Sequence, residues 1–348
     1  MKMNKLGREQ LAVSELCLGT MTWGSQDAPE AAVRQIETVL ERGINFIDTA
    51  ELYPVNPIRV ETVGRTEEII GDWIAANPSR RAEFVLATKV TGPSPSVRDG
   101  EGFSGAILRK TVEASLARLR TDYIDLYQLH WPMRGSYHFR QNWGYDPSGQ
   151  NREETVAHMR DVLGAAQELV TAGKIRHLGL SNETAWGTMM WLHLAREMGA
   201  PEVISVQNEY SLMCRYYDLD MAELSANEGV RCLSYSPLAM GILSGKYGDG
   251  STVPKGSRRE INPELGGRSV GRAFEAAQAY VAVAQKHGLS PVAMALRWVA
   301  DRPFMGSVIF GARNEMQLEE VLSAAKLTLS DEVRADLDAV HRAYPMPY

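Results

Sequence analysis

Residues 44–48 carry the sequence INFID, a short apolar run that ends on the carboxylate of Asp48. Such β-branched and aromatic residues favour a strand. Upstream, Val33, Ile36 and Leu40 share one face of a helix by their spacing. Gly43 stands between the two, where a left-handed helix cap needs no side chain. The local pattern therefore predicts a helix, a glycine turn and a strand.

Similar apolar runs that end on a polar residue recur along the chain, and segments with helical periodicity lie between them. The clearest helix is predicted for residues 154–172, with Gly173 after it. This alternation favours parallel strands joined by helical crossovers. The eight predicted strands are residues 15–19, 44–48, 84–89, 123–130, 175–181, 203–207, 231–236 and 307–310.

Eight such units without a shift in composition favour a closed (β/α)₈ TIM barrel of the α/β class over an open doubly wound sheet. We expect residues 1–348 to form this single domain. Residues 5–14 are predicted to form a β-hairpin that plugs the barrel floor, and residues 327–343 an extra helix outside the barrel. The long connections 53–64, 133–152 and 239–271 follow strand ends and should lie on the catalytic face.

Composition limits the classes of partner. The 348 residues include 37 Lys and Arg against 43 Asp and Glu, a net charge of −6. A mildly acidic chain is not expected to bind nucleic acid or anionic lipid through bulk charge, so an anionic ligand must be held by a few local cations. No run has the length of a membrane span or a secretory signal. Cys17, Cys214 and Cys232 match neither a disulfide framework nor a zinc pattern, and we expect buried thiols of a cytoplasmic protein.

Three predicted strands end on polar residues that are spaced by 41 residues in each step, namely Asp48, Lys89 and His130. The carboxyl ends of barrel strands meet at one mouth, so these side chains should converge there. Tyr53 follows Asp48 on the next loop, close enough to lean over the same mouth. The group does not look like a metal-ligand set, but it suits proton transfer.

A phenol has an ordinary pKa of about 10, too high for an efficient acid or base near neutrality. The ammonium of Lys89 should lower the pKa of Tyr53, and an ion pair with Asp48 should keep Lys89 protonated. His130 is placed to hydrogen-bond and orient a substrate carbonyl oxygen. Each residue alone has a structural interpretation, as a helix cap, a packed ring or an ordinary ion pair. Their convergence favours the functional one.

Eight segments of the chain match the motifs of one known family: LGTMTWG (18–24), GINFIDTAELYP (43–54), ATKV (87–90), DYIDLYQLHWP (122–132), GKIRHLGLSNE (173–183), SVQNEYSL (205–212), SYSPLAMGILSGKY (234–247) and GARNEMQLEE (311–320). Through these segments the chain resembles the aldo-keto reductases, and within them the Tas-like branch of bacterial NADP(H)-linked enzymes. The resemblance covers essentially the whole chain in the family's order.

The resemblance implies reduction of a small-molecule carbonyl substrate by hydride from NADPH, with Tyr53 as general acid and Asp48, Lys89 and His130 completing a tetrad. It also implies a substrate pocket walled by Trp23, Tyr53, His130 and Trp131. Cofactor contacts are expected from Gly19, Thr20, Met21, Asp48, Ser181, Asn182, Gln207, Tyr235, Ser236, Pro237, Leu238, Gly241, Leu243, Lys246, Arg258, Gly311, Arg313, Gln317 and Glu320.

Within that set, the resemblance implies that the nicotinamide carboxamide is hydrogen-bonded by Ser181, Asn182 and Gln207, and that Tyr235 stacks beneath the nicotinamide ring. No G-x-G-x-x-G follows any predicted strand, so phosphate must be bound by residues 236–246 and by the helix that begins after Gly311.

The resemblance places the adenosine 2′-phosphate near Arg313 and assigns Lys246 and Arg258 to the neighbouring clamp. A guanidinium on that phosphate would favour NADPH over NADH. Without the resemblance, Lys246, Arg258 and Arg259 are typical of a solvated basic loop. Val321 stands where the family usually has Asn, which removes one adenine contact.

Other interpretations stay open at this point. The family includes NADPH-binding β-subunits of potassium channels, so a regulatory subunit with slow turnover is the main alternative. A barrel lyase or aldolase that uses Lys89 as a Schiff-base amine is a third. Trp23 could pack at the barrel rim instead of lining the substrate pocket. Residues 133–152 could form a substrate lid or a surface that binds a partner. Substrate identity and oligomeric state are not specified by the sequence.

Overall fold

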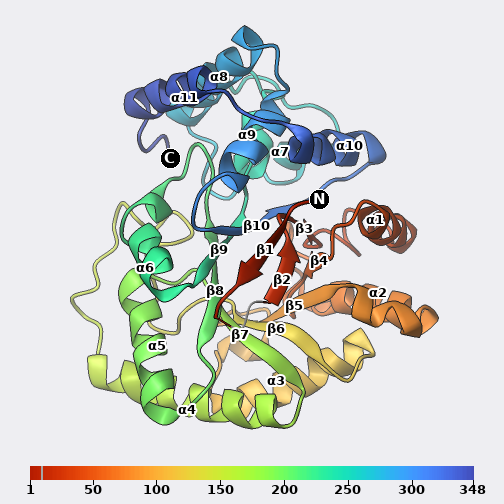
Figure 1. Cartoon of the computed structure of the whole chain (residues 1–348), viewed down its shortest axis with the longest axis vertical. Coiled ribbons are helices and arrows are strands. Elements are labelled where there is room, and N and C mark those ends of the chain that lie inside the picture. The colour runs from red at the N-terminus through yellow and green to blue at the C-terminus, as the bar shows by residue number, and fades with distance from the viewer. Residues whose placement is uncertain (9–10) are drawn as a thin grey trace.

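Eight parallel strands close into a barrel in the computed structural model, which describes residues 1–8 and 11–348 (Figure 1). Their order around the barrel is β10-β3-β4-β5-β6-β7-β8-β9. The predicted TIM barrel is confirmed, and each predicted strand lies within two residues of an observed one at either end. The strands are β3 (Leu16–Gly19), β4 (Phe46–Asp48), β5 (Val85–Val90), β6 (Ile124–Leu129), β7 (Ile175–Ser181), β8 (Val203–Glu209), β9 (Arg231–Tyr235) and β10 (Met305–Phe310).

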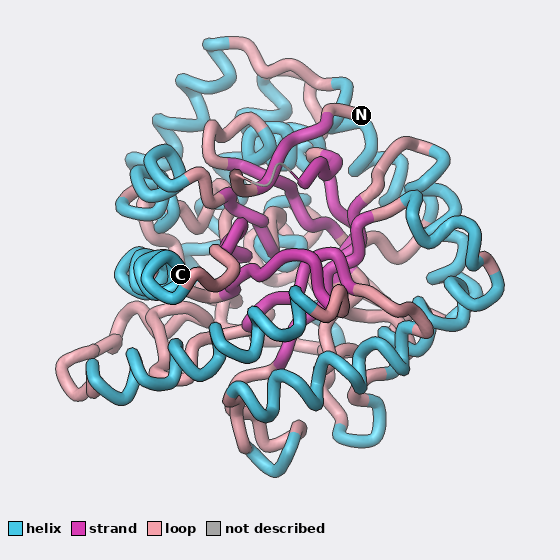
Figure 2. The backbone as a smooth tube through the Cα atoms, turned by 60° about the horizontal axis from the view of Figure 1, so that its bottom comes forward, coloured by secondary structure: helices cyan, strands magenta, loops and turns pink. Residues whose placement is uncertain are grey.

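Helices surround the strands, as Figure 2 shows from a second direction. Gly43 and Gly173 adopt φ angles of +77° and +73° between helix and strand, which confirms both predicted turns. The helices are α1 (Pro29–Glu41), α2 (Arg65–Ala76), α3 (Gly105–Leu119), α4 (Arg152–Thr171), α5 (Ala185–Met198), α6 (Asp220–Glu228), α7 (Arg258–Ile261), α8 (Gly271–Lys286), α9 (Pro291–Ala300), α10 (Glu315–Ser323) and α11 (Asp331–Ala343).

The last part of the chain is more helical than a plain repeat. Three helices, the short α7 and the longer α8 and α9, separate β9 from β10. The predicted extra helix is α11, which packs on α8 outside the barrel, with Lys286 Nζ 2.7 Å from Asp336 Oδ2. Within the described residues, none of the helices combines the length and apolarity needed to cross a bilayer.

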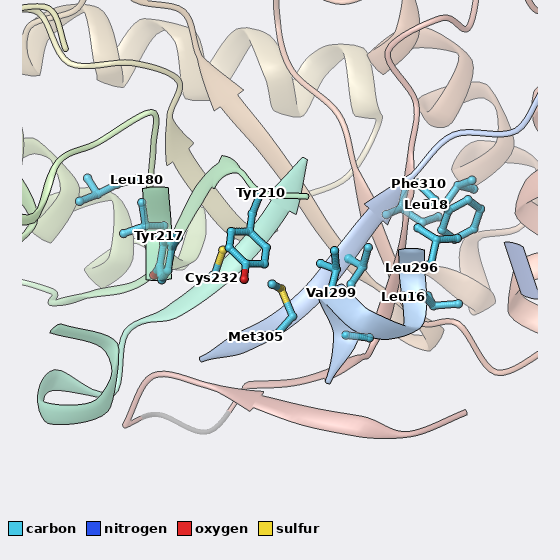
Figure 3. Close-up of a cluster of buried hydrophobic side chains, with 14 of the residues drawn as sticks. Leu16, Leu18, Leu180, Tyr210, Tyr217, Cys232, Leu296, Val299, Met305 and Phe310 are labelled. Carbon is cyan, nitrogen blue, oxygen red and sulfur yellow. The ribbon is translucent and has the colours of Figure 1, made fainter. Parts of the chain in front are cut away.

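The strands are buried on both faces. Every residue of β4, β5, β6, β8 and β10 is buried, as parallel strands covered by helices require. On the outer face, Leu296 and Val299 of α9 lie with Leu16, Leu18 and Phe310 in one apolar cluster (Figure 3). This packing fixes the strands, and therefore the positions of the residues at their carboxyl ends.

A hairpin closes the floor of the barrel. Strands β1 (Met3–Leu6) and β2 (Leu11–Ser14) pair antiparallel, and Leu6 is completely buried in an apolar cluster with Phe46 and Val85 at the start of β4 and β5. Asn4 Nδ2 donates to Gly306 O at 2.9 Å. The predicted plug is confirmed and begins two residues earlier; residues 9 and 10 of the prediction lie outside the described residues. The carboxyl end is the end that this hairpin leaves uncovered.

We expect Leu6→Ala to lower the free energy of unfolding by about 2–5 kcal/mol, because it leaves a cavity in the barrel floor. Urea denaturation followed by circular dichroism measures the change. Leu219→Ala is the matched control, since Leu219 is 71% exposed and its truncation should have little effect. Equal losses in the two variants would contradict a closing role for the hairpin.

Candidate active site

A buried ion pair joins two neighbouring strands at the open end of the barrel. Asp48 is the last residue of β4, and Lys89 lies near the end of β5. Lys89 Nζ donates to Asp48 Oδ2 at 2.6 Å and to Thr49 O at 2.7 Å. The Lys89 side chain is fully buried and that of Asp48 is 2% exposed, so each charge depends on the other.

Tyr53 and His130 complete the group. Lys89 Nζ lies 4.9 Å from the centroid of the Tyr53 ring, and the rings of Tyr53 and His130 meet edge-on with centroids 5.9 Å apart. The loop after β4 holds Tyr53 in place, because the N–H of Gly64 donates to Tyr53 O at 3.1 Å. The structure therefore brings together the four side chains that the sequence placed at one mouth.

The protonation of this group differs in one respect from the prediction. Burial raises the pKa of Tyr53 above its ordinary value, and the opposing effect of Lys89 does not overcome it. The prediction of a lowered Tyr53 pKa is therefore wrong, because burial destabilises the phenolate more than one nearby ammonium stabilises it. Burial also lowers the pKa of Lys89, but Asp48 and Tyr53 raise it more, so it is raised overall and the ammonium persists as predicted.

His130 is a neutral imidazole. Burial, followed by the charge of Lys89, holds the pKa of His130 well below its usual range. Among the described residues, its Nδ1 atom is buried and has no hydrogen-bond partner. The ring lies against Trp131, with centroids 4.8 Å apart. A neutral imidazole carries one N–H and one acceptor nitrogen, so it can orient a polar ligand without adding charge.

Two amides support the carboxylate of Asp48. Gln128 Nε2 donates to Asp48 Oδ1 at 3.0 Å, and Gln207 Nε2 donates to the same oxygen at 2.8 Å. Gln207 was assigned to the nicotinamide, whereas here its amide nitrogen supports Asp48. Gln128 was not identified from the sequence. Its spacing of two residues from His130 at the end of β6, which puts both side chains on one face of the strand, was the signal that could have found it.

A second network of hydrogen bonds joins residues at the carboxyl ends of β7 and β9. Ser181 Oγ donates to Gln207 O at 2.8 Å, and Asn182 Nδ2 donates to His130 O at 2.9 Å. Tyr235 OH donates to Asn182 Oδ1 at 2.6 Å. These bonds connect the ends of successive strands, so the side chains expected around the nicotinamide share one rigid rim.

One large cleft of about 1540 Å³ runs across this mouth. Small-molecule sites usually measure about 300–1000 Å³, so the cleft has room for a dinucleotide together with a second ligand. Most of the predicted site residues line it: Gly19, Thr20, Met21, Asp48, Tyr53, His130, Trp131, Ser181, Asn182, Gln207, Tyr235, Ser236, Pro237, Leu238, Gly241, Lys246, Arg258, Gly311, Arg313, Gln317 and Glu320.

Three of the predicted residues do not line the cleft. Lys89 is completely buried and pairs with Asp48. Trp23 is 1% exposed and packs in the apolar core, and Leu243 does the same. The structure therefore gives Trp23 its packing alternative rather than a place on the substrate wall, and the Leu243 side chain turns away from the predicted phosphate site.

Cations gather at the end of the cleft near α10. Arg313 Nε lies 3.8 Å from Asp27 Oδ1, and the Arg313 guanidinium also donates to Gly256 O. Burial lowers the pKa of Lys246, and the nearby charges of Arg258 and Arg313 lower it further. Across residues 1–8 and 11–348, neither Lys246 nor Arg258 has a carboxylate within ion-pair distance. Such a group of cations suits a polyanionic ligand.

The start of α10 is less open than the sequence suggested. Asn314 Oδ1 accepts from the Gln317 N–H at 2.9 Å, and Gln317 Oε1 accepts from the Arg313 N–H at 3.0 Å. These side chains satisfy two backbone donors that were expected to face an anion. Glu320 Oε1 accepts from Ser290 Oγ at 2.8 Å. Val321 lines the cleft and is 3% exposed, so the wall there is apolar.

The long connection 133–152 forms part of the same cleft. Gly135, Ser136, Phe139, Arg140 and Gln141 line it. Part of this segment therefore lies at the cleft, and its role as a substrate lid or a partner surface stays a prediction. Trp143, farther along the connection, is 70% exposed.

Comparison with known proteins gives one consistent family. Residues 15–342 match the model of the aldo/keto reductase family. The chain is 40% identical to protein tas of Escherichia coli (strain K12), over 100% of this chain and 99% of that protein. It is 37% identical to an aldo-keto reductase of Babesia bovis, over 75% of this chain and 96% of that one. A probable voltage-gated potassium channel subunit beta of Arabidopsis thaliana is 28% identical, over 93% and 91% of the two chains.

We expect Lys89→Met to lower the free energy of unfolding by about 3–5 kcal/mol, because it leaves the Asp48 carboxylate buried without a cation. The double variant Asp48→Asn with Lys89→Met should lose less, since it removes both charges. Urea denaturation of the single and double variants measures the coupling between the two side chains.

Arg109→Met is the control for this pair, because it breaks a solvent-exposed ion pair with Glu168 and should change stability little. A Lys89→Met variant that is as stable as Arg109→Met would show that the buried pair does not hold the site together.

Proposed function

The chain belongs to the aldo/keto reductase family, and we propose that it reduces an aldehyde or ketone to an alcohol with NADPH as cofactor and Tyr53 as proton donor. The observation that carries this proposal is the buried group of Asp48, Tyr53, Lys89 and His130 at one end of a cleft whose other end gathers cations. Membership of the family supports oxidoreduction in general, and the site supports the more specific reaction.

The cleft suits NADPH on three counts. Its volume accommodates a dinucleotide, Lys246, Arg258 and Arg313 gather where phosphates would lie, and His130 offers a buried ring nitrogen at the opposite end. When bound, NADPH would supply the hydride. Ser181 and Asn182 would hold the carboxamide, and Tyr235 would lie against the nicotinamide ring. The guanidinium groups would bind the 2′-phosphate, which distinguishes NADPH from NADH.

Tyr53 carries the O–H that would be donated to the carbonyl oxygen. Burial raises its pKa, which keeps the phenol protonated at neutral pH but makes it a weaker acid, so donation would depend on the nearby ammonium. The phenolate left behind would be stabilised by the ammonium of Lys89, 4.9 Å from the ring centroid. Asp48 holds that ammonium in place, and the amides of Gln128 and Gln207 hold Asp48.

His130 would orient the carbonyl group. Its lowered pKa keeps the imidazole neutral, so it can hydrogen-bond the carbonyl oxygen without competing with Tyr53 for the proton. The neighbouring Trp131 ring lines the cleft and would exclude water from the same position. Binding and proton donation are thus assigned to different side chains.

The alternatives have less support. A Schiff-base role for Lys89 requires a neutral amine, but Asp48 and Tyr53 keep its pKa raised. The regulatory-subunit interpretation rests on the 28% identity to a channel subunit and requires tight NADPH binding with negligible turnover. Measurement of turnover beside binding separates that function from the reductase.

We expect Tyr53→Phe to reduce the rate of NADPH oxidation with aromatic and short-chain aldehydes by about 10²–10⁴-fold, because the variant lacks the donated proton. Loss of NADPH absorbance measures the rate, and quenching of tryptophan fluorescence measures cofactor binding, which should persist. The reductase function fails if the purified protein oxidises no NADPH with any aldehyde, or if Tyr53→Phe turns over as fast as the wild type.

We expect Arg258→Gln to raise the KM for NADPH about ten- to hundredfold while the KM for NADH changes far less, because only NADPH carries the 2′-phosphate. Steady-state kinetics with both cofactors give the ratio. Arg259→Gln removes the same charge one residue later, from a side chain that bonds Gly250 O and does not line the cleft. An unchanged NADPH to NADH ratio in Arg258→Gln argues against the proposed phosphate clamp.

A further inference from the structure

The substrate end of the cleft contains two arginines that share one carboxylate. Arg140 Nη1 donates to Glu209 Oε2 at 3.0 Å, while Arg268 donates to Glu209 Oε1 through Nε at 2.8 Å and lies 2.7 Å from Oε2 through Nη2. Both arginines line the cleft. Two cations and one anion leave this cluster with a net charge of +1.

The cluster lies directly above the tetrad. Glu209 is two residues beyond Gln207 on β8, so both side chains project from the same face of that strand. Two residues of a parallel strand span about 7 Å. Gln207 itself contacts Asp48 at 2.8 Å. Glu209 and the two arginines paired with it therefore lie one step along the strand from the residue that contacts Asp48.

Arg140 is the arginine that is free to bind a ligand. Arg268 is 2% exposed, and its Nη1 also donates to Leu265 O at 3.1 Å, so its donors are already used. Arg140 is 17% exposed and, within the described part of the chain, makes its one hydrogen bond through Nη1. Its Nε and Nη2 atoms have no hydrogen-bond partner among the described residues, and the residue lines both the cleft and an adjoining hollow beside Gly266 and Gly267.

No unpaired acid opposes this charge along the described wall. The acids that line the cleft are Asp48, which is paired with Lys89, and Glu320, which lies on α10 with the phosphate-binding cations. Arg140 is paired with Glu209 through Nη1 and is the more exposed of the two arginines on this part of the wall. A substrate that carries an anion would therefore meet attraction there.

Between His130 and Arg140 the wall is aromatic. The rings of His130 and Trp131 lie 4.8 Å apart, and those of Trp131 and Phe139 meet edge-on at 5.9 Å. Phe139 directly precedes Arg140. A flat apolar body would pack on these rings, with its carbonyl at His130 and an anionic group at the guanidinium.

Resting on the proposed reductase function, we propose that the substrate is an aromatic or similarly apolar carbonyl compound bearing a carboxylate, and that Arg140 binds this carboxylate. The residue would act in substrate selection rather than in the chemical step. Its effect should appear in KM and not in kcat, because the anion is bound equally before and during hydride transfer.

The test compares 4-carboxybenzaldehyde with the neutral 4-methylbenzaldehyde in wild type, Arg140→Gln and Arg140→Lys. The ratio of kcat/KM values for the two aldehydes cancels their intrinsic reactivities. In Arg140→Gln this ratio should fall about ten- to hundredfold through KM of the carboxylated aldehyde. Arg140→Lys should restore part of it, because a point charge remains without the guanidinium fork.

Arg272→Gln is the matched control. Arg272 lines an adjoining hollow of about 620 Å³ together with Arg140 but does not line the cleft, so its removal tests general charge effects. An unchanged ratio in Arg140→Gln, or an equal fall in Arg272→Gln, overturns the inference.

Failure of the inference is distinguishable from failure of the reductase function. A wild type that reduces the neutral aldehyde while Arg140→Gln keeps the wild-type ratio refutes the inference alone. A wild type that oxidises no NADPH with these two or with any other aldehyde refutes the reductase function. In that case calorimetric binding of the two corresponding alcohols decides the inference: preference for the carboxylated alcohol that depends on Arg140 supports it, and equal binding overturns it.

Discussion

The ion pair between Lys89 and Asp48 is the constraint on which the rest of the site depends. Neither charge is tolerated alone at this depth, so the fold must hold two strands in a register that keeps the atoms within 2.6 Å. Two amides complete the coordination of the carboxylate, and the ammonium in turn faces the Tyr53 ring. The packing of the barrel strands and the arrangement of the tetrad therefore share one electrostatic requirement.

Much of this architecture was predictable because strand ends in a parallel barrel meet. A regular step of 41 residues was enough to bring Asp48, Lys89 and His130 to one mouth, and the apolar hairpin was recognisable as a plug. The balance between burial and charge at Tyr53 was not predictable, since the depth of a phenol is a property of the packed structure. For the same reason the sequence could not decide whether Trp23 lines the cleft or packs in the core.

The cluster of Arg140, Glu209 and Arg268 escaped prediction for a different reason. Its members come from two irregular loops and one strand, and no periodicity relates them. Only Glu209 carried a signal, because it follows Gln207 at the spacing of one strand face. A mildly acidic chain thus gathers cations along one cleft, from the group near α10 to the arginines that pair with Glu209, and Arg268 acts electrostatically on Arg258.

The hairpin at the barrel floor also limits the routes by which a ligand can reach the site. Because Leu6 and its neighbours seal the amino end, the ligands of this cleft share the opposite opening. Two short strands at one end of the barrel thereby restrict access to the tetrad at the other end.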